Sequence, residues 1–173
     1  MKTIINKSDV IILRKTKIED LEFVIESERK HENAQFVGQW TKEQHIYSLN
    51  DSDILHIIVE SIATSKPIGY LIIAGIENKN NSIEFRRFVI CEKGNGFGKE
   101  ALKLVKELAF TKLKAHRLWL DVRLKNIRAK NVYKSMGFKE EGILRECIFH
   151  DDEYESLIVM SILKNEYIDN IKN

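Results

Sequence analysis

Cysteine, proline and net charge are all scarce in this 173-residue chain. The two cysteines, Cys91 and Cys147, are too far apart in sequence to form a metal-binding or redox pair, and the five histidines show no ligand spacing. We therefore expect no metal. The net charge is only +2, so bulk electrostatics give no reason to expect a nucleic-acid partner. No apolar run approaches the length of a membrane span, and no membrane partner is expected either.

What is present fits one globular domain. Apolar residues make up 43% of the chain, which is enough for a substantial core, and the 31% of charged residues favours a soluble, cytoplasmic protein. Residues 1–17 mix polar and apolar side chains without an apolar h-region, so no secretion signal is expected. The chain has no repeat, low-complexity tract or linker. We expect a single domain over residues 1–173, with its core at about residues 10–163.

Apolar periodicity predicts an α/β (α+β) fold, a mixed sheet flanked by helices in the order β-α-α-β-β-β-α-β-α-β-β. Capping-box spacing at residues 16–19 and 41–44 precedes the first two helices, and Phe110 and Trp119 are expected in the core. Residues 151–153 predict a hairpin turn, and residues 164–173 a polar tail. The expected strands are 10–13, 54–61, 68–76, 83–90, 118–122, 138–149 and 154–163, and the expected helices are 21–28, 41–49, 99–114 and 126–136.

The most informative segment is Lys93-Gly94-Asn95-Gly96-Phe97-Gly98-Lys99, which lies between a predicted strand and a predicted helix. Glycines let a ligand approach the backbone, and the free N–H groups of the first helical turn favour a negative charge. This arrangement predicts a phosphate or pyrophosphate site. It is not a P-loop, which needs four residues between its first glycine and Gly-Lys, nor a dinucleotide fingerprint, which needs G-x-G-x-x-G.

The loop resembles the coenzyme A loop of the GNAT superfamily of N-acetyltransferases, (Gln/Arg)-x-x-Gly-x-(Gly/Ala), with Lys93 in the first position. A second segment, Asn126-Ile127-Arg128-Ala129 and then Tyr133-Lys134-Ser135-Met136-Gly137-Phe138, resembles the family's N-x-x-A…Y-x-x-x-G-F motif. The resemblance covers about residues 10–163. Residues 141–146 and 154–156 extend it to the branch of ribosomal-protein N-terminal and spermidine acetyltransferases.

The resemblance implies the GNAT fold, whose central sheet is mixed and mostly antiparallel, and the transfer of an acetyl group from acetyl-CoA to a primary amine. The amine could belong to a protein N-terminus, a polyamine or another small molecule. Lys93 keeps the positive charge of the family's loop but lacks an arginine's planar fork, and the turn before Gly94 is shorter than in many relatives. The residues expected to hold acetyl-CoA are Phe88, Val89, Ile90, Lys93, Gly94, Asn95, Gly96, Phe97, Gly98, Lys99 and Asn126. A plain helix N-cap is the other role open to Asn126.

Acetyl transfer needs a base, because an alkylamine with a pKa of about 10 is protonated at neutral pH. The resemblance favours Glu84, which is expected to share a strand face with Arg86, Phe88 and Ile90; an ion pair with a neighbouring arginine is the other reading. Tyr133 is the expected acid for the departing thiolate, with core packing as the alternative. We expect direct attack in a ternary complex. An acyl-cysteine on Cys91 is disfavoured because no histidine is near in sequence.

The acceptor pocket is expected between the first two helices, with Phe36 and Trp40 as an aromatic wall and Glu84 beside the amine. Three further acids could attract a cationic amine or simply form solvated surface: Glu28, Glu32 and Glu43. A homodimer is compatible with the resemblance, since relatives are often dimers. Two rival functions remain open: a module that binds acyl-CoA without catalysis, and a nucleotide-binding protein.

Overall fold

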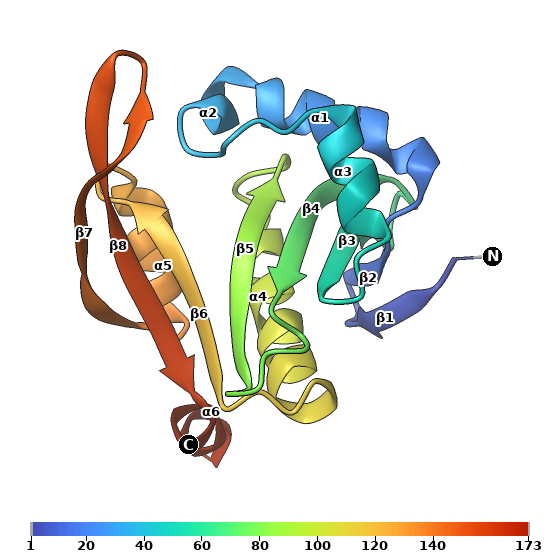
Figure 1. Cartoon of the computed structure of the whole chain (residues 1–173). Coiled ribbons are helices and arrows are strands. Elements are labelled where there is room, and N and C mark those ends of the chain that lie inside the picture. The colour runs from blue at the N-terminus through green and yellow to red at the C-terminus, as the bar shows by residue number, and fades with distance from the viewer. Residues whose placement is uncertain (1, 173) are drawn as a thin grey trace.

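A computed structural model describes residues 2–172 as one twisted sheet with helices on both faces (Figure 1). Its strands are β1 (Ile4–Lys7), β2 (Ile11–Lys15), β3 (Ile54–Ser61), β4 (Pro67–Ala74), β5 (Ser82–Ile90), β6 (Arg117–Arg123), β7 (Lys139–His150) and β8 (Glu153–Leu163). Its helices are α1 (Leu21–Arg29), α2 (His31–Ala34), α3 (Lys42–Leu49), α4 (Phe97–Glu107), α5 (Ile127–Ser135) and α6 (Lys164–Lys172), with a 3-10 turn η1 (Ile18–Asp20) and a π-helical turn η2 (Leu108–Lys112). No helix within residues 2–172 is both long and apolar enough to cross a membrane.

The predicted order of elements is confirmed. The strands are arranged β1-β2-β3-β4-β5-β6-β8-β7, and all neighbours are antiparallel except β5 and β6. The sequence did not reveal β1, α2 or α6. The predicted polar tail is wrong for residues 164–172, because Tyr167 stacks on Phe110 at 4.8 Å and anchors α6 to the core. Asn173 lies outside the described residues.

The helix starts show where local sequence rules hold and where they fail. The capping box at Thr41 is confirmed: its hydroxyl accepts from the N–H of Gln44 and its own N–H donates to the Gln44 side chain. The predicted box at residues 16–19 is wrong, because Thr16 contacts the His56 ring instead and Asp20 accepts the N–H of Lys17. Helix α4 begins two residues earlier than predicted, directly after Gly96.

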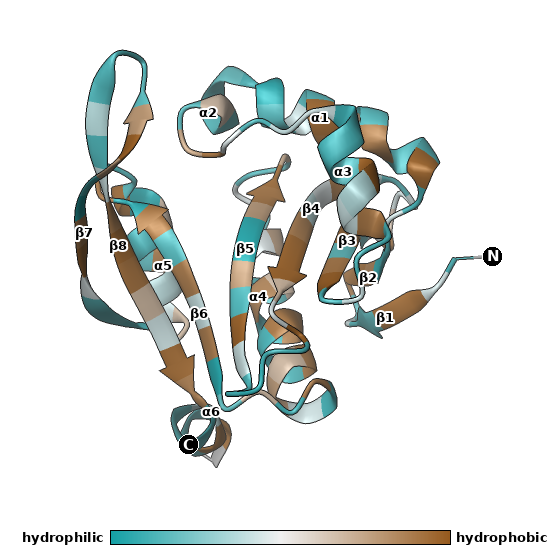
Figure 2. Cartoon of the chain, viewed as in Figure 1, coloured by the Kyte–Doolittle hydropathy of each residue, from teal (hydrophilic) through white to brown (hydrophobic). Residues whose placement is uncertain are grey.

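Two apolar clusters fill the two faces of the sheet (Figure 2). The larger lies under α4 and α5 and includes Phe110 and the alternating residues Leu118, Leu120 and Val122 of β6, as predicted. The smaller lies under α1 and is built around Val24 and buried β-strand residues. Trp119 is half-buried beside the Arg117 guanidinium rather than in the core, because it points to the face opposite its apolar neighbours.

The feature that positions the site is the separation of β5 from β6. Their parallel pairing covers only Ser82–Glu84 on β5 and Arg117–Trp119 on β6, after which the strands diverge (Figure 1). Each strand remains paired on its other side, β5 with β4 and β6 with β8. The diverging halves therefore face each other with backbone edges that no neighbouring strand covers, in a wedge that opens toward α2.

A β-bulge in β5 changes which side chains share a face. The register with β4 shifts between Phe85 and Arg87, so Arg86 is the extra residue. Before the bulge Phe85 points to the α4 face, and after it Phe88 also does. The expectation that Glu84 shares a face with Phe88 is therefore wrong: Glu84 alternates with Phe85 and lies on the α1 face.

A buried ion cluster ties the start of α1 to the sheet. The Arg14 guanidinium binds both oxygens of Asp20, at 2.7 and 2.9 Å, and donates to Glu60 at 2.8 Å. Burial works to raise the pKa of both carboxyls, but the hydrogen bonds outweigh it and both pKa values are lowered. These two groups therefore add stability above their unfolded pKa values and lose it as the pH falls through the folded ones.

Arg14→Ala should leave the buried Asp20 carboxylate without its ion-pair partner and Glu60 with Lys2 alone, and should cost about 3–5 kcal/mol of unfolding free energy at pH 7. The deficit should begin to narrow near pH 4, the range of the unfolded pKa values, and should close as the pH falls through the lower folded pKa values and both carboxylates become protonated. Denaturant unfolding of the variant and the wild type at several pH values measures this difference in unfolding free energy. Lys103→Gln, which removes an exposed pair with Glu100 on α4, is the control and should leave the midpoint unchanged. A deficit that stays constant with pH would contradict the assignment.

Candidate active site

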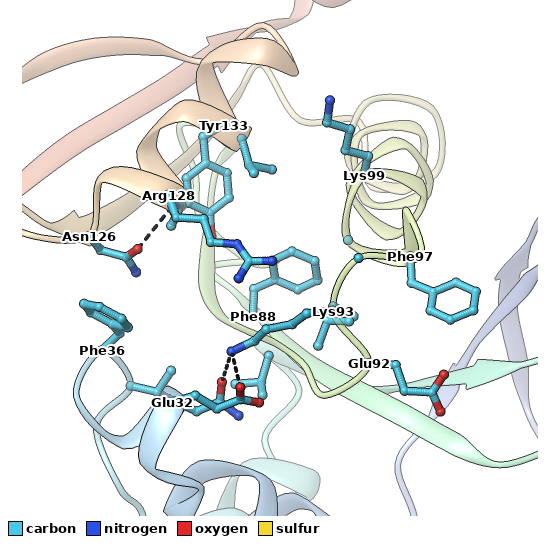
Figure 3. Close-up of a pocket in the computed structure, with 18 of the residues that line it drawn as sticks. Glu32, Phe36, Phe88, Glu92, Lys93, Phe97, Lys99, Asn126, Arg128 and Tyr133 are labelled. Atoms are coloured by element: carbon cyan, nitrogen blue, oxygen red, sulfur yellow. Dashed lines mark hydrogen bonds and ion pairs between the residues drawn. The ribbon is translucent and has the colours of Figure 1, made fainter.

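One pocket collects most of the residues singled out in the sequence. It has a volume of about 640 Å³, within the usual range for small-molecule sites, and lies where β5 and β6 diverge. The end of β5, the glycine loop, the start of α5 and the end of α2 line it (Figure 3). The predicted residues that line it are Phe36, Phe88, Val89, Ile90, Lys93, Gly94, Gly96, Phe97, Gly98, Lys99, Asn126 and Tyr133.

Three predicted residues are not among those lining the pocket: Trp40, Glu84 and Asn95. Val89 contributes to the lining, but its side chain is buried in the smaller cluster under α1. This is the arrangement expected of a strand whose backbone edge, rather than every side chain, faces a ligand.

The glycine loop has the geometry of an anion cradle. Gly94 and Gly96 have φ of 89° and 76°, the left-handed region that side chains disfavour, and Gly96 is the N-cap of α4. A Cβ on Gly94, Gly96 or Gly98 would meet no protein atom within 4 Å, so the space above these residues is open to a ligand. The first N–H groups of α4 have no partner within the helix and are directed there.

Basic side chains surround this cradle. Lys99 stands on the first turn of α4, Arg128 on the first turn of α5, and Lys125 precedes α5; all three line the pocket. Lys93 behaves differently. Its ammonium group reaches across the pocket to Glu32 at 3.2 Å and to the Asn33 side chain at 3.3 Å (Figure 3).

Asn126 fills the cap role that the sequence left open. Its side-chain oxygen accepts from the N–H of Ala129 at 3.1 Å, which fixes the start of α5. Only the oxygen is used in this way. The side-chain NH2 group of Asn126 therefore remains available as a donor at the pocket wall, so helix capping and ligand binding are compatible.

Tyr133 lies with its ring against Phe138, in the larger core cluster, and also lines the pocket. No hydrogen bond joins its hydroxyl to any other group in residues 2–172. Burial, and secondarily the charge of Asp121, raise its pKa, so the hydroxyl keeps its proton at neutral pH. The side chain is thus a core residue that also lines the pocket, with a hydroxyl that keeps its proton.

Glu84 is half-buried on the α1 face, at the point where pairing with β6 stops. One of its oxygens accepts two hydrogen bonds from Arg86, at 2.7 and 2.9 Å, which is the ion pair that the sequence left open. Asp121 of β6 lies on the same face, two residues beyond Trp119, the partner of Glu84. Although Asp121 is exposed, the protein packed around its carboxyl and then the charge of Glu84 raise its pKa.

The acceptor side differs from the predicted aromatic wall. Phe36 and Val37 line the pocket, whereas Trp40 stacks on the Arg87 guanidinium, 4.2 Å from its ring centre. Glu28 is 1% exposed and bound to Tyr70 and Arg87, so both readings left open for it, attraction of an amine and solvated surface, are wrong. Two other acids remain accessible: Glu32 at the pocket and Glu43 on α3, outside it.

Sequence reasoning did not assign Arg128, Asp121, Lys125 or Val37 to the site. Arg128 stands inside a segment that carried the resemblance, two residues after Asn126, so its place near the site could have been predicted. Cys91 donates to the Ser27 hydroxyl at 3.2 Å and contacts no histidine within residues 2–172, which gives an acyl-cysteine no activating base.

Known proteins resemble this chain over nearly its full length. It is similar to the spermidine N(1)-acetyltransferase of Vibrio cholerae, 27% identical over 169 residues, covering 91% of this chain and 95% of the relative. It is also similar to the Escherichia coli K12 spermidine N(1)-acetyltransferase, 28% identical with 90% and 87% covered. A crystal structure of the Vibrio cholerae enzyme in complex with CoA and spermine matches it with a TM-score of 0.82 at 25% identity, covering 91% of this chain and 98% of that one.

The expected fold is therefore confirmed by a solved structure as well as by the order of elements. A sequence model of the acetyltransferase (GNAT) domain matches residues 11–139, about three quarters of the chain. The protein thus belongs to the GNAT acetyltransferase domain family and is an acetyl-CoA-dependent N-acetyltransferase.

Proposed function

We propose that the acceptor is a polyamine, and that the acetyl group passes to one of its primary amines by direct attack in a ternary complex. The observation that carries the proposal is the similarity to two spermidine acetyltransferases over nearly the full chain, together with the Glu32 carboxylate on the acceptor side of the pocket. Glu32 at the pocket, and Glu84 and Asp121 at the base of the wedge, offer negative charge to a cationic chain.

In this proposal the loop and β5 hold acetyl-CoA. The cradle of Gly94 and Gly96, with Lys99 and Arg128, binds the phosphates. The uncovered edge of β5 pairs with the extended pantetheine arm as a neighbouring strand would, and the Asn126 amide contacts it from the opposite wall. Lys93 must give up Glu32 before it can contribute to phosphate binding.

Proton transfer is divided between the two faces of the sheet. Glu84, on the α1 face, takes a proton from the ammonium, and the freed amine nitrogen attacks the thioester carbonyl carbon. Tyr133, on the opposite face, gives its hydroxyl proton to the sulfur as the C–S bond breaks, and the proton that the new amide nitrogen loses returns to Tyr133 through water. The backbone N–H groups of β5 can stabilise the oxyanion that forms between these steps.

The hairpin of β7 and β8 supports a homodimer as part of the proposal. It projects from the sheet, and β7 is the last strand of the sheet, with an uncovered edge (Figure 1). Hydrophobic residues lie along both strands (Figure 2), and four of them are exposed. These are Ile143, Leu144, Phe149 and Tyr154. Such an edge is a natural surface for pairing with a second copy.

The acceptor is tested by measuring thiol release from acetyl-CoA with spermidine, spermine, free lysine and a peptide that begins with alanine. The polyamines should give the highest kcat/KM, by about tenfold or more, equivalent to roughly 1.4 kcal/mol of transition-state binding. A preference for the peptide would instead favour a protein N-terminus. Tight binding of CoA with no turnover on any amine would support the non-catalytic module.

Glu84→Gln keeps the shape of the side chain and removes the base. The turnover number should fall by about 10²–10⁴ if the carboxylate accepts the proton, and the loss should lessen at high pH, where more amine is already free. Steady-state rates from pH 6 to 10 measure this. Glu77→Gln, at an exposed position beyond β4, is the matched control. An unchanged pH–rate profile in the Glu84→Gln variant would show that Glu84 is not the general base.

Tyr133→Phe removes one hydroxyl and keeps the ring against Phe138. Turnover should drop while acetyl-CoA affinity stays within about threefold, because the proton is needed only as the C–S bond breaks. Single-turnover kinetics and calorimetry on one preparation separate the two quantities. The matched control is Tyr47→Phe, on the exposed face of α3. A lower melting temperature with normal turnover would mean that the hydroxyl is only structural.

A further inference from the structure

The acetyl-transfer scheme leaves one buried polar network without a role. It lies under α1 and α3 and is centred on the Glu28 carboxylate, which accepts from the Tyr70 hydroxyl at 2.5 Å, from an Arg87 N–H at 2.5 Å and from the Trp40 N–H at 3.0 Å. Burial works to raise the pKa of Glu28, but the contacts of His45, Tyr70 and Arg87 outweigh it and the pKa is lowered. The network therefore holds an ionised carboxylate inside the protein.

Arg87 enters this network because of the bulge in β5. It directly precedes Phe88 in the strand that lines the pocket, but the extra residue Arg86 turns its side chain to the α1 face. There its guanidinium contacts three different groups: the Glu28 carboxylate of α1, the carbonyl oxygen of Gly38, and the face of the Trp40 ring.

Two backbone atoms of the loop between α2 and α3, residues 35–41, are fixed by this pair of charges. The carbonyl of Gly38 accepts from Arg87, and the N–H of Trp40 donates to Glu28. The same loop carries Phe36 and Val37, which form the pocket wall on the acceptor side. The position of that wall is therefore tied, through one guanidinium, to the strand that lies beside the glycine loop.

We propose that Arg87 is a positioning residue for the acceptor: with Glu28 it sets the distance between the α2–α3 loop and β5, and thereby the acceptor side of the pocket. The assignment rests on the proposed function, which places the amine against this loop. Arg87 is not among the residues that line the pocket, so in this proposal it does not contact the substrate. Its effect on the reaction passes through Phe36 and Val37.

Further buried polar groups surround this pair. Behind Glu28 the His45 ring contacts the His56 ring at 3.1 Å, which contacts the Thr16 hydroxyl at 2.9 Å. Burial lowers the pKa of His56 to about 3, so that ring is neutral and adds no competing charge. An arginine can donate to the carboxylate and the carbonyl and also stack its planar guanidinium on the indole ring. A lysine would keep the positive charge but could not make these three contacts together.

The experiment compares Arg87→Lys with the wild type in three measurements: the acetyl-CoA Kd, the KM for spermidine, and kcat. The KM for spermidine should rise by about tenfold, while the acetyl-CoA Kd stays within about twofold. Arg29→Lys, at an exposed position next to Glu28 on α1, is the matched control and should change neither. A parallel rise of both constants, or an unchanged KM, would overturn the assignment.

A fluorescence measurement keeps the test independent of the proposed reaction. In a Trp119→Phe background Trp40 is the remaining tryptophan, and Arg87→Lys should move its emission to longer wavelength and increase quenching by acrylamide. If no amine is acetylated, the proposed function fails, but the emission shift still measures whether Arg87 holds the loop around Trp40 in place. An unshifted spectrum would overturn the role of Arg87 whatever the activity.

A second variant covers the case in which Arg87→Lys does not fold. Glu28→Gln keeps an acceptor for the Trp40 N–H but removes the charge that binds the guanidinium. It should produce the same split, a higher KM for spermidine with a nearly unchanged acetyl-CoA Kd. A uniform loss of both would count against positioning.

Discussion

The site depends on one constraint in the sheet: two parallel neighbours, β5 and β6, stop pairing after Glu84 and Trp119. The loss of pairing costs little stability, because each strand is already paired along its other edge and the backbone groups on the uncovered edges can bind water or a ligand. Since the strands are parallel, their carboxyl ends lie at the same edge of the sheet. The glycine loop after β5 and Asn126 after β6 therefore meet across the opening, as ligand-binding loops do in open α/β sheets.

Much of the fold and the cofactor side of the site could be predicted from sequence, because both are encoded locally. Period-two alternation placed β6 and its buried face, and glycines with an adjacent helix start marked the anion cradle. The bulge was overlooked although a signal was present. The apolar residues Ile83 and Phe85 are two apart, but Phe85 and Phe88 are three apart, and such a change of parity indicates an extra residue in a strand.

The acceptor side could not be predicted in the same way, because its contacts join residues far apart in the chain. Trp40 fits an aromatic wall by type, yet Arg87, 47 positions later, draws it to a different surface. Lys93 fits a phosphate ligand by its place in the motif, yet Glu32 and Asn33 bind it from α2. In the sequence, Glu28 resembles any surface acid of a helix, but in the fold it is buried and bound to Tyr70 and Arg87. Local composition gives the residue type but not the partner.

The nearly neutral net charge conceals a division of charge across the wedge. Lys99, Arg128 and Lys125 gather where phosphates would bind, whereas Glu84 and Asp121 lie on the α1 face at its base. A polyanionic donor and a polycationic acceptor would each be attracted to one side and repelled from the other. In the proposed reaction this separation also keeps the proton acceptor and the proton donor apart. A base and an acid in direct contact would exchange the proton with each other, whereas two faces of one sheet let the thioester lie between them.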